Sequence, residues 1–79
     1  MRSERGQRSF VNLSKAYLFW TTLKGANMSG AILKGANMSR ANMSGASGIT
    51  NEELEQQAHS LKGATMPNGQ KYEDWLEDQ

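Results

Sequence analysis

The chain has no cysteine, one proline and one histidine among its 79 residues. Without cysteine it forms neither a disulfide framework nor a thiolate metal site. No apolar run approaches the ~20 residues that a membrane span needs, and the N-terminus lacks the apolar core of a signal peptide. The default expectation is one small, soluble domain in the cytoplasm, without a large core.

Residues 11–45 repeat with a period of five, in the units VNLSK, AYLFW, TTLKG, ANMSG, AILKG, ANMSR and ANMSG. A step of five suits neither an α-helix, around which the third residue of each unit would wander, nor a continuous strand, in which it would alternate between faces. Each unit must therefore contain its own turn, and the pattern predicts a coil of short extended sides with the apolar residues inside. The predicted core column consists of Leu13, Leu18, Leu23, Met28, Leu33, Met38 and Met43.

The run ANMSG–AILKG–ANMSR–ANMSG resembles the pentapeptide-repeat proteins, whose pattern is A(D/N)LXX. The resemblance implies an all-β solenoid, namely a right-handed quadrilateral β-helix of about two coils with four repeats in each coil. Positions twenty residues apart should then stack at the ~4.8 Å strand spacing, for example Leu13 below Leu33. The segment 48–76 resembles the C-terminal ending of many such proteins, which implies a C-terminal α-helical cap.

Signals for the start of a helix follow the repeats. Thr50 and Glu53 have the spacing of a capping box, and Leu54 and Leu61 lie on one apolar stripe of the helix that would follow. Trp75 is predicted to be the aromatic anchor of a second, short helix. The predicted divisions are a polar basic N-terminal arm at 1–10, the β-helix at 11–50 and a cap at 51–79, which holds a helix over about 51–61, a repeat-like side at 63–66, a turn at 67–69 and a short helix over about 71–77.

Three aromatic residues break the surface pattern of the repeats. Tyr17, Phe19 and Trp20 stand where other units hold Asn, Ser, Lys or Gly, at positions that should point outward. Arg40 comes twenty residues after Trp20 and is expected above its ring, in a cation–π contact. Two interpretations stay open, since this apolar surface is either covered by the N-terminal arm or the C-terminal tail, or is a partner-binding patch.

The net charge of +1 conceals two oppositely charged halves. Residues 1–50 hold seven basic side chains against one acidic side chain, whereas residues 51–79 hold seven acidic side chains against two basic ones. This division fits two solvated surfaces, and it also fits docking or head-to-tail association. The basic half is a candidate surface for an anionic partner, either a nucleic acid or a membrane surface, although the acidic half argues against a nucleic acid.

No group of residues in the sequence predicts catalysis. Asn and Ser recur beside the central residue of the units, so we expect them to satisfy backbone groups at the corners, and His59 lies off the repeat without a paired nucleophile. No catalytic residue, cofactor or metal site is predicted. The resemblance implies a structural or protein-interaction module that binds an unknown protein or a second copy of itself. DNA-mimic inhibition of gyrase, an activity known in that family, is not expected because residues 11–50 contain no acidic side chain.

Overall fold

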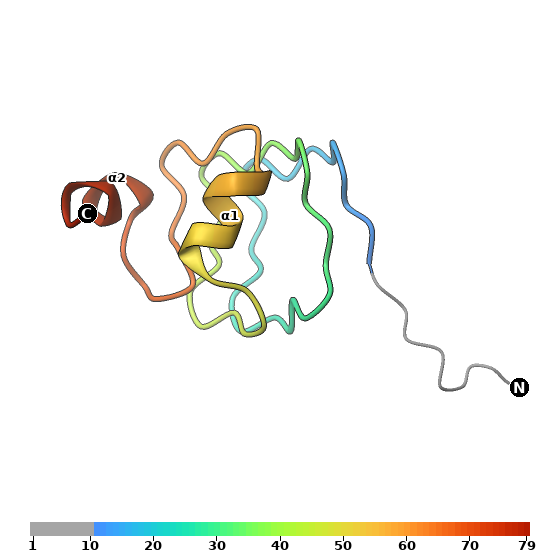
Figure 1. Ribbon diagram of the computed structural model, residues 1–79, viewed down its shortest axis with the longest axis horizontal. Coiled ribbons are helices and arrows are strands. Elements are labelled where there is room, and N and C mark those ends of the chain that lie inside the picture. Colours follow the sequence, from blue (N-terminus) through green and yellow to red (C-terminus); the bar gives the residue numbers. More distant parts are fainter. Residues whose placement is uncertain (1–10) are drawn as a thin grey trace, which may run out of the picture.

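The computed structural model describes residues 11–79, which form a stack of coils followed by two short helices (Figure 1). The helices are α1, Asn51–Gln57, and α2, Tyr72–Glu77. The predicted N-terminal arm at 1–10 lies outside the described residues. The first coil and α2 lie at opposite ends of the stack (Figure 1), so the two ends present different surfaces.

Parallel bridges join residues that are twenty positions apart and stack one coil on the next. The upper residue of each bridge makes two backbone hydrogen bonds with the coil below. For example, Ile32 donates its N–H to the carbonyl of Val11 at 2.9 Å and accepts the N–H of Leu13 at 2.7 Å. Residues 11–79 contain no strand longer than one bridging residue, and a turn every five residues gives each coil four sides. The bridged pairs are Asn12 with Ile32, Tyr17 with Asn37, Thr22 with Asn42, and Asn27 with Ser47.

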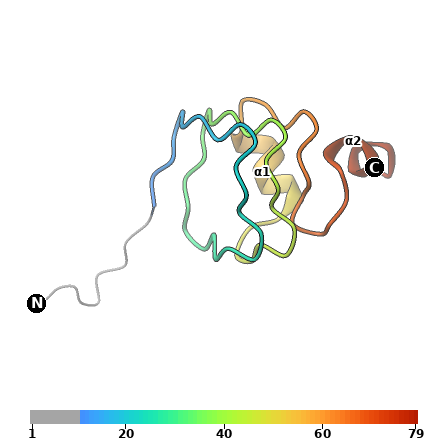
Figure 2. The ribbon, with the colours of Figure 1, turned by 180° about the vertical axis from the view of Figure 1, so that it is seen from behind.

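The apolar column lies inside the coils, but its burial differs along the stack. Leu33, Met38 and Met43 of the second coil are fully buried. Leu13 and its equivalents in the first coil, Leu18 and Leu23, are only partly buried. The second coil has a described neighbour on each side and the first coil on one side only, which accounts for the difference. Figure 2 shows neighbouring coils side by side, with α1 behind them.

Asparagine side chains satisfy backbone groups at the corners, as the repeat predicted. In four units the Oδ1 atom accepts a hydrogen bond from the backbone N–H two residues later, at 3.0 to 3.1 Å. This local bond is the Asx turn that makes asparagine a common corner residue. The serines take part through their backbone N–H groups. The bonded pairs are Asn12 with Ser14, Asn27 with Ser29, Asn37 with Ser39, and Asn42 with Ser44.

Helix α1 replaces one side of the third coil. It starts with a reciprocal capping box, in which Thr50 Oγ1 accepts the N–H of Glu53 at 3.1 Å and Glu53 Oε1 accepts the N–H of Thr50 at 2.9 Å. Leu54 is fully buried against the core. After the helix, Ser60 bridges to Asn37, so the spacing between stacked residues increases from 20 to 23. A helix rises only ~1.5 Å per residue against ~3.3 Å in a strand, so it needs extra residues to span the same side.

The prediction of a helix over about 51–61 is wrong at its C-terminal end, because α1 ends at Gln57. His59 donates its N–H to the carbonyl of Ala36 at 2.7 Å, which returns the chain to the coil. Leu61 therefore lies buried inside the third coil and not on a helical stripe. A repeat signal explains this, since the tetrapeptide LKGA occurs at 23–26, at 33–36 and again at 61–64.

Helix α2 is attached to the end of the stack by three of its side chains. Trp75 is 6% exposed. The hydroxyl of Tyr72 donates to Glu55 Oε2 at 3.2 Å, and Glu73 Oε2 accepts the N–H of Gly63 at 2.9 Å. Burial and the neighbouring Glu55 carboxylate raise the pKa of Tyr72, so its hydroxyl stays protonated and keeps this hydrogen bond.

Gly48 has little room for a side chain in the described part of the chain. Its φ is +80°, and an added Cβ would lie 2.5 Å from the backbone nitrogen of Ser29, whereas Gly25 has a φ of +72° with open space around it. Gly25→Ala should lower the free energy of unfolding by about 1–2 kcal/mol, the cost of a left-handed residue. Gly48→Ala should cost about 1–3 kcal/mol more, because it also overpacks the contact with Ser29. Urea unfolding measures both variants, and equal losses would contradict the close approach.

Glu73 should make the stability of the cap depend on pH. The hydrogen bond from the N–H of Gly63 lowers the pKa of Glu73 below its ordinary value of 4.5. The stabilisation is therefore complete above that ordinary value and is lost as pH falls through the lowered pKa of the folded state. Glu73→Gln removes the titration, so the variant should lose less stability than the wild type below about pH 4.5. Thermal unfolding between neutral and acidic pH tests this.

The matched control is Glu77→Gln on the same helix. The side chain of Glu77 makes no hydrogen bond to another residue of the described chain. This variant should keep the acid dependence of the wild type. If both variants lose stability alike as the pH falls, the bond between Glu73 and Gly63 is not the cause.

Candidate interaction surface

The outward positions of the second repeat unit hold three aromatic side chains. Leu18 is the inward residue of this unit, so the residues on either side of it point away from the core. Tyr17 is 73% exposed, Trp20 is 64% exposed and Phe19 is 37% exposed. The five-residue turn therefore presents three rings on the outside of one coil.

These rings form an ordered cluster. The rings of Tyr17 and Phe19 are stacked, with centroids 5.9 Å apart, and Trp20 meets Phe19 edge to face at 5.7 Å. The guanidinium carbon of Arg40 lies 5.1 Å from the centre of the Trp20 ring, as the twenty-residue stacking predicted. We call Tyr17, Phe19, Trp20 and Arg40 the aromatic patch. Its rings are held in place by one another and by a cation from the next coil.

Two members of the aromatic patch have a strained backbone. Trp20 and Arg40 have φ angles of 65° and 61°, and Lys15 at another corner has 63°. The same corner position is glycine, the residue best suited to positive φ, in four other units, at Gly25, Gly30, Gly35 and Gly45. A side chain at such a corner costs stability, which points to a use for the side chain beyond folding.

The C-terminal tail does not cover the aromatic patch, so that interpretation is wrong. Helix α2 and the chain after it lie at the end of the stack opposite the first coil (Figure 1). The other proposed cover, the N-terminal arm at 1–10, lies outside the described residues. Tyr17 and Trp20 are accordingly the most exposed large apolar side chains in residues 11–79.

The remaining predicted residues have structural surroundings. Thr50 and Glu53 form the capping box, and Leu54, Leu61 and Trp75 are buried at the capped end of the stack. His59 is exposed at the point where the chain returns to the coil. Within residues 11–79 no cluster of three or more His, Cys, Asp or Glu side chains has a geometry that could hold a metal ion.

A family model described as pentapeptide repeats matches residues 12–47 in eight copies. This chain is a pentapeptide-repeat protein. Comparisons with curated proteins and with solved structures found no match. Pentapeptide repeats generally form right-handed quadrilateral β-helices, and the family suggests a structural or protein-interaction module. Pentapeptide-repeat proteins are generally not enzymes.

Neither helix of this pentapeptide-repeat protein, within residues 11–79, has the length and apolar character needed to cross a bilayer. One polar residue that sequence reasoning missed is Asn51, the first residue of α1. It is 7% exposed and is the only buried polar residue in the described part of the chain. An asparagine next to a helix cap is ordinary in sequence, so no signal indicated its burial.

Proposed function

We propose that this pentapeptide-repeat protein is a protein-interaction module that binds through its first coil, on a scaffold with the right-handed quadrilateral β-helix of its family. The aromatic patch is the observation that supports this function most directly. Exposed groups of apolar side chains mark interaction sites, and aromatic residues and arginine are enriched at interfaces. The strained corners at Trp20 and Arg40 fit side chains kept for binding.

The lower edge of the first coil adds backbone hydrogen-bonding groups beside the aromatic patch. In the second coil the bridging residues pair with the coil below, but the equivalent N–H and C=O groups of the first coil have no backbone partner in residues 11–79. Unpaired groups of this kind are a template for pairing with another chain. Tyr17 contributes its ring to the aromatic patch and its backbone to this edge. The unpaired residues are Asn12, Tyr17, Thr22 and Asn27.

A second copy of the chain is the partner that this edge fits. Two copies related by a twofold axis would place their first coils face to face, with the paired sides antiparallel. The N–H groups of one edge would then face the C=O groups of the other. The half-buried Leu13 and its neighbours would be covered in the same contact. The proposed assembly is therefore a dimer joined at the first coils.

Trp20→Gly tests this function with little effect on folding. Glycine occupies the same corner in other units, and the relief of backbone strain offsets the lost contact with Arg40. The wild type should change from monomer to dimer as its concentration rises. Trp20→Gly should weaken the dimer by about 2 kcal/mol, as expected when a large aromatic side chain is removed from an interface. Light scattering after size exclusion measures the dimer fraction.

Lys15→Gly is the matched control, because it relieves the same strain in the same coil but removes no ring. It should leave the dimer intact. A wild type that stays monomeric at every concentration, or a Trp20→Gly variant that dimerises as well as the wild type, would contradict the proposal.

The basic repeat surface supports a second candidate function, the binding of an anionic partner. Lys15, Lys24 and Lys34 are exposed, and residues 11–50 contain no acidic side chain. Binding to phosphates should weaken steeply as salt increases. Lys15→Gly would weaken this binding and leave the dimer unchanged, so the two functions are separable. Absence of association with duplex DNA or anionic vesicles at low salt would exclude this candidate.

A further inference from the structure

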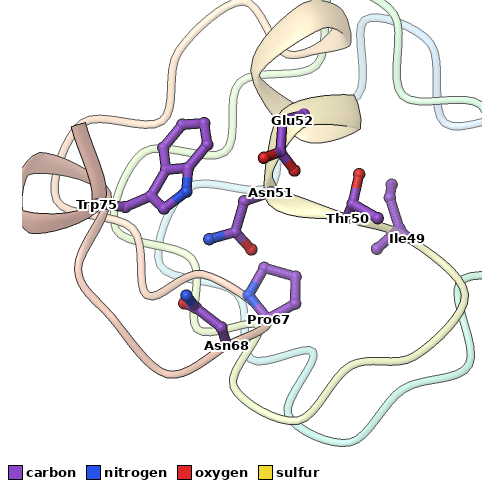
Figure 3. A pocket seen from close by; sticks show the side chains of 7 residues that line it. All are labelled: Ile49, Thr50, Asn51, Glu52, Pro67, Asn68 and Trp75. Atoms are coloured by element: carbon purple, nitrogen blue, oxygen red, sulfur yellow. The ribbon is translucent and has the colours of Figure 1, made fainter. Parts of the chain in front are cut away.

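A cavity of about 420 Å³, widely open to solvent, lies in the cap between the start of α1, the turn after the third coil, and α2 (Figure 3). Ile49, Pro67 and Trp75 supply apolar walls. Its volume falls in the range of small-ligand sites. The cavity belongs to the capped end of the stack and is separate from the aromatic patch on the first coil. The polar residues that line it are Thr50, Asn51, Glu52 and Asn68.

Asn51 places an unpaired amide in this cavity. The residue is 7% exposed, and its side chain makes no hydrogen bond to another residue of the described chain. Figure 3 shows the amide between the indole of Trp75 and the ring of Pro67. Buried polar side chains in folded proteins are almost always hydrogen-bonded to protein or ordered water, so an amide without a partner in the described chain is free to bond a ligand in this cavity.

Trp75 adds a second unpaired group to the same cavity. The residue is 6% exposed, and its indole N–H has no hydrogen-bond partner in residues 11–79. In Figure 3 the indole nitrogen lies on the side of the ring that faces Asn51. A buried indole N–H usually has a partner. The cavity therefore offers donors from both side chains and one acceptor, the amide oxygen of Asn51.

A peptide backbone has the chemistry that matches these groups. The side-chain amide of Asn51 carries a donor and an acceptor side by side, and an extended peptide presents an N–H and a C=O in the complementary arrangement. The indole N–H of Trp75 can donate to a further carbonyl. Ile49 and Pro67 leave room for a small aliphatic side chain. A sugar would need an exposed ring face to stack on, and Trp75 does not offer one.

The charge around the cavity indicates which type of residue should follow or precede the aliphatic residue in the bound peptide. Glu52 is exposed at the cavity and makes no hydrogen bond to another residue of the described chain. Residues 51–79 carry seven acidic side chains against two basic ones. We propose that this cavity binds an extended segment of another protein, in which a small aliphatic residue lies next to Lys or Arg.

The test titrates the full chain, labelled with ¹⁵N, with the blocked peptide acetyl-Ala-Val-Lys-Ala-amide. The side-chain NH₂ signals of Asn51 and the indole signal of Trp75 should shift together. The indole signal of Trp20 lies outside the site and should stay in place. The same peptide with an N-methylated valine lacks the N–H that Asn51 would accept, and it should bind about tenfold more weakly.

Two protein variants separate binding from folding. Asn51→Leu removes the unpaired amide at similar size, so the melting temperature should stay the same or rise while peptide affinity falls about tenfold. Glu52→Gln should weaken the lysine peptide several-fold, and Glu77→Gln, on α2 and outside the cavity lining, should not. Trp20→Gly should bind the peptide as the wild type does, which keeps this test independent of the proposed dimer.

Several results would overturn the proposal. One is the absence of any shift at millimolar peptide, and another is equal binding of the N-methylated peptide. Equal binding by Asn51→Leu, or a fall in the melting temperature of that variant, would show that the amide has a structural partner instead. Shifts of the same signals with methyl glucoside and not with the peptide would assign the cavity to a carbohydrate.

Discussion

The backbone hydrogen bonds between neighbouring coils are the constraint on which this structure depends. In the second coil each bridging residue donates its N–H to the first coil and accepts an N–H from it, and no group within a single coil replaces these bonds. The first two coils therefore keep a spacing of twenty residues, because a shift by one residue would turn the apolar column outward. In the third coil the spacing is 23, since α1 takes up three extra residues while the ladder keeps its pairing. Burial follows from the same constraint, since Leu33 has a coil on both sides and Leu13 has a described neighbour on one side only.

The two ends of the stack differ in how the apolar column and the backbone groups of the last coil are covered. At the C-terminal end α1 makes its own hydrogen bonds inside a helix and still presents Leu54 to the core. Gly48 makes this exit possible, because the chain leaves the ladder there in contact with the backbone of Ser29. At the other end the first coil keeps its bridging groups unpaired within residues 11–79. The two ends differ because α1 and α2 cover the C-terminal end, whereas no other element of residues 11–79 covers the first coil.

The parts of the fold that follow from local rules were predictable from the sequence. The period of five, the asparagine corners and the capping box at Thr50 each rest on a short pattern with one physical solution. The end of α1 was not predicted correctly, because Leu61 fits both a helical stripe and a repeat unit. Inter-coil hydrogen bonds decide between the two, and they depend on residues far away in the sequence.

The candidate sites also differ in whether the sequence indicated them. Tyr17 and Trp20 were identifiable because they depart from a regular surface pattern, so the repeat itself supplies the standard against which they are exceptions. Asn51 has no such standard, since its burial depends on Trp75 and Pro67, which lie beside its amide only in the folded chain.

In a repeat protein the inner coils have each face set by their neighbours, which leaves little freedom for side chains that serve another purpose. Departures from folding rules are expected where that restriction is weakest. The strained Trp20 lies on the first coil, and the unpaired amide of Asn51 lies in the cap, at the two ends of the stack. Trp20 occupies a corner that glycine fills in other units, and Asn51 buries an amide without a partner in the described chain, so the folding rules alone do not favour either residue. Their placement at opposite ends fits the two proposed contact sites, because each site then uses the surface that neighbouring coils restrict least.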